Sequence, residues 1–128
     1  MASDIPDPIL RFFEAKIDSI ELVHVLMLLF DRPEERWTIE KISGELRSSE
    51  SSVAKRVETL VGRGVISRAS VEGETVKYVP FDAEMGRTVQ EALAYYKTRP
   101  YRMVELVFSN RTNTIRSIAD AFRFRKED

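Results

Sequence analysis

The chain has 128 residues, of which 43% are hydrophobic and 32% are charged, an ordinary balance for a single globular domain. It contains no cysteine and one histidine, which excludes a disulfide framework, a thiolate metal site and a cysteine nucleophile. The net charge is −1, and no apolar run is long enough to span a bilayer. We therefore expect one cytoplasmic domain over 1–128, with no bound metal or cofactor and no insertion into a membrane.

The first two predicted helices lie in the N-terminal quarter of the chain. Pro8 suits the opening of a helix, and a second helix, capped by Asp18 or Ser19, extends to about Asp31. This second helix is apolar nearly all round, so we expect it to be the buried central helix. His24 lies within it and is interpreted as a satisfied core or interface histidine. The first helix carries one apolar stripe, made of Ile9, Phe12, Phe13 and Ile17.

Two more helices are predicted in the middle of the chain, separated by a tight turn. Thr38 can cap a short helix that ends at Leu46, and Trp37 before it is expected to plug a gap between helices. A serine at 48 or 49 can cap the next helix, which a glycine at 62 or 64 can end. The inward stripe of that helix is predicted to be Val53, Val57, Leu60 and Val61.

A β-hairpin and further helices are predicted after residue 64. Segments 65–71 and 75–79 have strand character, with the turn at Glu72-Gly73. Helical spacing returns from Asp82 to Lys97, and residues 101–108 are also expected to be helical. Residues 114–128 predict a basic amphipathic helix. Packing on its own domain is one role for it; docking on a partner protein, on DNA or on a membrane surface are others.

Charge is distributed unevenly along these elements. Residues 1–46 hold 5 basic and 10 acidic groups, whereas residues 47–68 hold 5 basic and 2 acidic groups, a local balance of +3. Such a patch can attract a polyanion even when the whole chain is weakly acidic. The helix over 50–62 is therefore the first candidate for contact with nucleic acid.

The order helix, short helix, turn, helix and hairpin is that of a winged helix-turn-helix. Residues 20–80 resemble the winged helix of MarR-type bacterial transcriptional regulators, on three motifs: Trp37-Thr38-Ile39, Ser49-Glu50-Ser51-Ser52, and Leu60-Val61-Gly62-Arg63-Gly64-Val65-Ile66. The resemblance implies a mainly α fold with a small β-hairpin. It also implies a DNA-binding transcriptional regulator, with a recognition helix at about 50–62 in the major groove and a wing at about 65–79.

The candidate DNA-contacting residues follow from the helical period and from chemistry. With the valine and leucine stripe inward, the polar residues of the recognition helix are predicted to face outward, where cations and hydroxyls can contact phosphates or base edges. Together with neighbouring turn and wing positions, the candidates are Arg47, Ser49, Ser51, Ser52, Lys55, Arg56, Thr59, Arg68 and Lys77.

The flanking segments 1–19 and 81–128 hold more apolar residues than a minimal winged helix needs. In MarR-type regulators the terminal helices build a twofold dimer, so the resemblance implies a homodimer. Packing of these helices on the core of one chain is the alternative. The candidate interface residues are Phe12, Phe13, Met85, Val89, Leu93 and Tyr96.

A second function remains open from the sequence. Glu72 and Glu74 at the tip of the wing would repel phosphate, so either the wing stands off the DNA or the winged helix binds another protein instead of DNA. No triad, phosphate-binding loop or paired-carboxylate pattern appears in the sequence, so no catalytic residue is predicted and the chain is not expected to be an enzyme.

Overall fold

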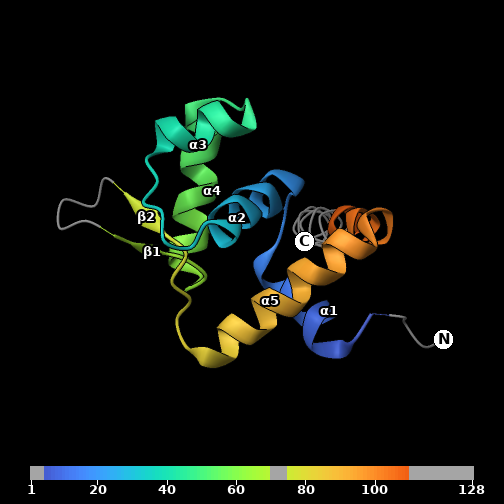
Figure 1. Ribbon diagram of the computed structural model, residues 1–128. Helices are drawn as coiled ribbons and strands as arrows, with labels where there is room; N and C mark the ends of the chain where they lie inside the picture. The colour runs from blue at the N-terminus through green and yellow to red at the C-terminus, as the bar shows by residue number, and fades with distance from the viewer. Residues whose placement is uncertain (1–4, 70–74, 110–128) are drawn as a thin grey trace, which may run out of the picture.

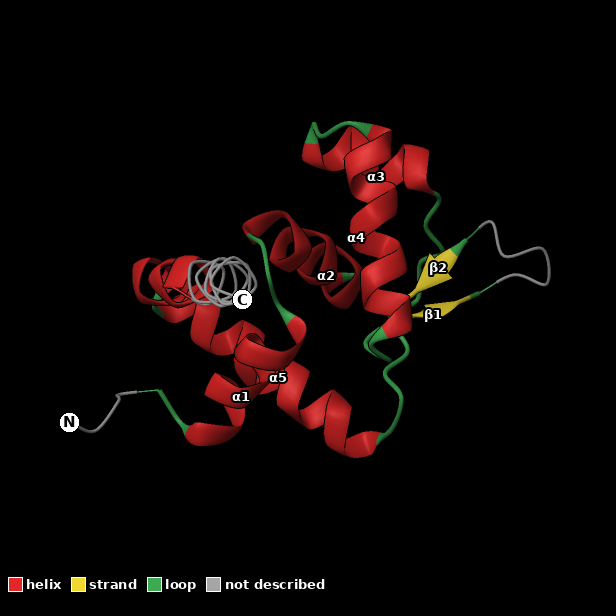
Figure 2. Ribbon diagram, turned by 180° about the vertical axis from the view of Figure 1, so that it is seen from behind, coloured by secondary structure: helices red, strands yellow, loops and turns green. Residues whose placement is uncertain are grey.

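The computed structural model describes residues 5–69 and 75–109 of the chain. In this part the fold is mainly helical, with one small antiparallel sheet, as the sequence predicts (Figures 1 and 2). The elements are α1 (Asp7–Lys16), α2 (Ile20–Asp31), α3 (Ile39–Leu46), α4 (Glu50–Gly62), β1 (Ser67–Arg68), β2 (Val76–Lys77) and α5 (Ala83–Thr98), followed by a helical segment at 100–109. The helix expected at 114–128 lies outside the described residues.

Side-chain caps define where four of the helices begin. In each case an oxygen of the cap accepts a hydrogen bond from the backbone N–H three residues later, which satisfies a donor that the helix itself leaves free. The four donor–acceptor distances lie between 2.8 and 3.2 Å. The caps are Ser19 for α2, Thr38 for α3, Ser49 for α4 and Asp82 for α5.

Helix α2 is the centre of the first layer, as its apolar sequence predicts. It packs against α3 and α4, and α3 also packs against α4 (Figure 1). His24 is not a core residue, because it is exposed on α2, where its ring meets that of Tyr96 edge to face with centroids 6.4 Å apart. The residues of α2 that are buried are Leu22, Val23, Val25, Leu26 and Leu29.

The sheet is shorter than the predicted hairpin and includes one additional residue. β1 and β2 are antiparallel, with Ser67 opposite Lys77, and the predicted turn lies outside the described residues. Trp37 adds an antiparallel bridge on the other side of β2, because its N–H and C=O both bond the backbone of Val76 at 2.8 Å. Trp37 is fully buried, and this bridge ties the start of α3 to the hairpin.

Helices α1 and α5 pack against each other and form a second unit below α2 (Figures 1 and 2). The apolar stripes of both helices are buried by this contact and by the rest of the core. The apolar residues that the sequence offers for a dimer interface therefore pack within one chain. Of the six candidates, Phe12, Phe13, Val89, Leu93 and Tyr96 are buried and Met85 is half-buried.

Candidate nucleic-acid interface

Helix α4 has a buried face and an exposed face with clearly different chemistry. Val53, Val57 and Leu60 are buried against the rest of the domain, as predicted. At about 100° per residue, the positions opposite this stripe are Ser51, Lys55, Glu58 and Gly62, and all four are exposed. The outer face of the helix thus carries one cation, one hydroxyl and one carboxylate.

Ser52 and Arg56 do not share that outer face, contrary to the prediction. They lie at the edge of the buried stripe, one turn apart, and both turn toward Glu21 at the start of α2. The hydroxyl of Ser52 donates a hydrogen bond to Oε1 of Glu21, and Nε of Arg56 donates to the same oxygen at 3.1 Å. The helical period explains this, because both positions are beside the Val53–Val57 stripe instead of opposite it.

This cluster also changes the ionisation of its carboxylate. The hydrogen bond from Ser52, and to a lesser degree Ser48 and Arg56, favours the charged form and holds the pKa of Glu21 below its usual value, although partial burial acts in the opposite direction. Glu21 is therefore a charged acceptor at neutral pH that binds the start of α4 to α2. Its effect is to hold one of the predicted DNA-contacting cations within the protein.

The turn before α4 carries an unusual backbone conformation at Arg47. Its φ is +56° and its ψ is +41°, in the left-handed region, and its N–H donates to the carbonyl of Ser43. Glycine or asparagine is the usual residue at such a helix end, because a Cβ there costs about 1–2 kcal/mol. Arg47 is exposed at this position, directly before the positive N-terminus of α4.

The remaining predicted contacts are partly engaged within the chain. Ser49 is the exposed cap of α4, whereas the hydroxyl of Thr59 donates to the Lys55 carbonyl at 2.9 Å. Arg68 on β1 forms an ion pair with Glu58 of α4, and Lys77 on β2 lies 3.8 Å from Glu34. Both pairs are at the surface, where such contacts are weak and exchange readily with other partners.

Three exposed cations in the segments around α3 and α4 have no ion-pair partner among residues 5–69 and 75–109. Two of them, Arg47 and Lys55, were predicted from the sequence. The third, Arg36, is exposed beside the buried Trp37 and was missed. The sequence could have indicated that Arg36 is exposed, because neighbouring residues in extended backbone point to opposite sides and Trp37 is buried.

A metal centre or a known relative would give a more specific indication of function. Within the described residues, no group of three or more histidine or acidic side chains is arranged to hold a metal ion, and no helix is long and apolar enough to cross a membrane. Comparison with known proteins found no matching family model, no similar curated protein and no similar solved structure. Functional interpretation therefore rests on the geometry of the chain itself.

Proposed function

We propose that the protein is a DNA-binding transcriptional regulator of the winged helix type, similar to MarR-type regulators. In this proposal α4 enters the major groove with the exposed face of Ser51 and Lys55 against the DNA, and β1 and β2 form the base of a wing beside it. The support is the order and packing of α2, α3, α4 and the hairpin, together with an exposed polar face on α4 opposite its core stripe.

The observation that carries the proposal is the conformation of Arg47. A left-handed arginine costs folding free energy that glycine would save, and in this proposal a contact of its side chain with DNA offsets that cost. An exposed guanidinium directly before the N-terminus of α4 can form two parallel hydrogen bonds to a phosphate, with the helix dipole adding to the attraction. Arg47 is thus assigned a phosphate of the DNA backbone.

The charges on this side of the protein determine how strong such binding can be. Arg47 and Lys55 are available as they stand, whereas Arg56 and Arg68 would first have to leave Glu21 and Glu58. Glu58 also places a negative charge on the face that meets DNA. We therefore expect weak nonspecific affinity from a single chain, with sequence-specific contacts limited to the few exposed groups of α4.

Substitutions at the two predicted cations test the proposal. Lys55→Ala removes an exposed cation, and Arg47→Gly removes a guanidinium while relieving the backbone at that position, so neither should destabilise the fold. Each should weaken binding to a duplex about threefold to tenfold at low salt, measured by fluorescence anisotropy. Arg87→Ala is the matched control, because Arg87 is an exposed cation on a different helix, α5.

The control separates a local contact from general electrostatic attraction. If Arg87→Ala weakens binding as much as Lys55→Ala does, the interaction follows net charge and α4 is not the contact surface. If none of the three changes affinity, or if the unmodified protein does not bind duplex DNA, the proposal is wrong.

A protein-binding winged helix is the second candidate, and a specific feature favours it. A hollow of about 440 Å³ lies between the start of α3, α4 and β2, and its wall includes the apolar side chains of Ala54, Val57 and Val76. The Glu58–Arg68 ion pair lies at this hollow, on the side assigned to DNA. A partner peptide could use this surface without any phosphate contact, in which case the affinity would depend little on salt.

A further inference from the structure

Glu58 is the carboxylate in the row of exposed positions that runs along α4 opposite its buried stripe. Ser51, Lys55 and Glu58 occupy successive turns of this row, and the side chain of Glu58 is 64% exposed. When this face of α4 meets DNA, phosphates surround the carboxylate and repel it, which lowers the affinity. A favourable contact for Glu58 must therefore come from a part of DNA other than the phosphates.

The two oxygens of this carboxylate are occupied differently. Oε1 accepts a hydrogen bond from Nη2 of Arg68 on β1, whereas Oε2 accepts none from residues 5–69 and 75–109. A charged carboxylate can only accept hydrogen bonds, and each of its oxygens has room for more than one donor. Glu58 thus holds a free acceptor on the exposed face of α4.

The donors in the major groove limit what such an acceptor can read. Guanine and thymine present acceptors there, and only the amino groups of cytosine and adenine donate. The amino group of adenine lies between two acceptors, its own N7 and O4 of the paired thymine, and both repel a carboxylate. The amino group of cytosine has an acceptor on one side only. Among the four bases, a glutamate is therefore matched best to cytosine.

Arg68 is suited to hold this carboxylate in place. Because Arg68 belongs to β1, its hydrogen bond attaches the flexible glutamate side chain to the hairpin as well as to its own helix. A side chain that is already held loses less conformational entropy when it contacts a base. The guanidinium also offsets the negative charge of Glu58 and so weakens its repulsion from the phosphates.

We propose that Glu58 selects a cytosine in the DNA target, with its free oxygen accepting a hydrogen bond from the cytosine N4 amino group, and that Arg68 is its positioning residue. This inference rests on the proposed function, because it requires α4 in the major groove. It adds a named base and a reason for the acidic residue. Glu58 lowers the affinity for DNA in general and thereby favours the one sequence that gives it a donor.

Selection of bound duplexes from a random-sequence library tests this inference without a known target. The unmodified protein should enrich a C·G pair at one position. Glu58→Gln should enrich adenine there, because an amide can accept from adenine N6 and donate to N7, and Glu58→Ala should show no preference. In anisotropy titrations, replacing that C·G pair should weaken binding of the unmodified protein about fivefold or more, and binding of Glu58→Ala less than about twofold.

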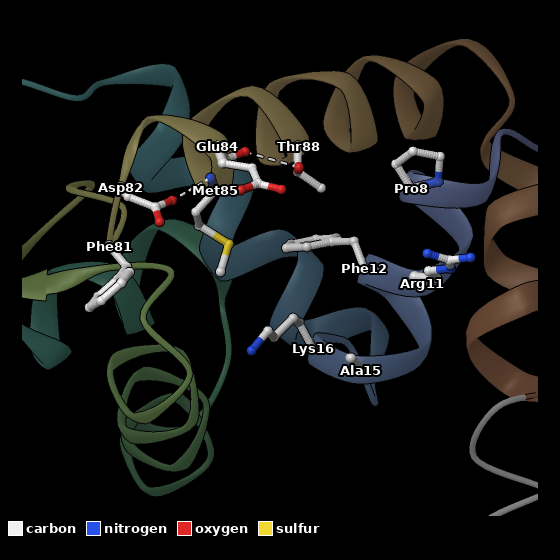
Figure 3. A pocket seen from close by; sticks show the side chains of 10 residues that line it. All are labelled: Pro8, Arg11, Phe12, Ala15, Lys16, Phe81, Asp82, Glu84, Met85 and Thr88. Carbon is white, nitrogen blue, oxygen red and sulfur yellow. Dashed lines mark hydrogen bonds between the residues drawn. The ribbon is translucent and has the colours of Figure 1, made fainter.

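Two other glutamates provide matched controls, because their substitution removes the same charge elsewhere. Glu50 lies in the first turn of α4, about 100° round the helix from Ser51. Glu84 lies at the start of α5, where it lines a hollow between that helix and α1 (Figure 3). Glu50→Gln and Glu84→Gln should both retain the preference for cytosine. The same change of base in either control as in Glu58→Gln would overturn the assignment to Glu58.

Arg68→Ala tests the positioning role, because a residue that only supports the fold would not alter the choice of one base. The preference for cytosine should weaken at that position alone, and Arg68→Lys should retain part of it, since lysine keeps the charge but not the fixed geometry of the guanidinium. An unchanged preference in Arg68→Ala would overturn the role of Arg68. Circular dichroism should show the same helix content in all variants, because the substituted side chains are exposed.

The results also separate this inference from the function on which it rests. If the unmodified protein binds no duplex, the proposed function and the inference are both wrong. If it binds duplexes but enriches the same base as Glu58→Gln at every position, or enriches none, the inference alone is overturned and DNA binding stands.

Discussion

Gly64 offers the sharpest test of the described geometry. Alanine at this position is predicted to lower the free energy of unfolding, whereas alanine at the nearby Gly62 is predicted to raise it. Gly64 follows the end of α4 with a φ of +76°, and an added Cβ would lie 3.2 Å from the Cβ of Phe81. An alanine there adds about 1–2 kcal/mol of left-handed strain. The added methyl group also crowds the Cβ of Phe81. That atom can move away only if the Phe81 backbone moves, which would disturb its hydrogen bond to the Gly64 carbonyl. We expect Gly64→Ala to lower the free energy of unfolding by about 2 kcal/mol.

Gly62 is the matched control, since it lies two residues earlier within α4 and has no atom within 4 Å of an added Cβ. Alanine there should raise the free energy of unfolding by about 0.5–1 kcal/mol, because it reduces the freedom of the unfolded chain in a helical position. Urea unfolding followed by circular dichroism measures both variants. Equal effects of the same sign, or an unchanged stability in Gly64→Ala, would refute the assigned backbone conformation and the close contact with Phe81.

Three further predictions concern the core and the charges around α4. Leu26→Ala should lower the free energy of unfolding by about 2–5 kcal/mol in urea titrations, because Leu26 is fully buried in α2; a cost below 1 kcal/mol would contradict the central position of α2. Glu21→Gln should cost about 1 kcal/mol at neutral pH. Because the pKa of Glu21 is lowered in the fold, the difference in stability between the two proteins should vanish as the pH falls through that pKa. A difference that persists in acid would contradict the bonding of Glu21 to Ser52 and Arg56. Glu58→Gln should strengthen DNA binding severalfold at low salt by removing a carboxylate from the exposed face of α4, and unchanged anisotropy titrations would remove α4 from the interface.

Elements with strong local signals were predictable from the sequence. Ser19, Thr38, Ser49 and Asp82 each begin a helix in the structure, because a capping oxygen three residues before a backbone donor is a local arrangement. The left-handed glycine after α4 and the buried α2 follow from similarly local information. The β-strands were predicted too long, since pairing depends on contacts that a sequence pattern does not report.

The candidate site was harder to predict because it depends on contacts between distant segments. Ser52 and Arg56 lie beside the buried stripe of α4, but their partner Glu21 is more than thirty positions away, so the sequence pattern of α4 does not report that they bond it. The same holds for the pairing of Arg68 with Glu58, which joins the hairpin to α4. The sequence predicts surplus apolar stripes on α1 and α5 because their mutual packing depends on contacts that neither segment alone reports.

The salt dependence of duplex binding tests the central proposal most directly. If Arg47 and Lys55 each neutralise one phosphate, the logarithm of the association constant should fall with the logarithm of salt concentration with a slope near −1.8 per chain, about 0.9 for each contact. Arg47→Gly and Lys55→Ala should each reduce that slope by about 0.9. A slope near zero, or the same slope in both variants as in the unmodified protein, would contradict DNA binding through α4 and favour a protein-binding winged helix.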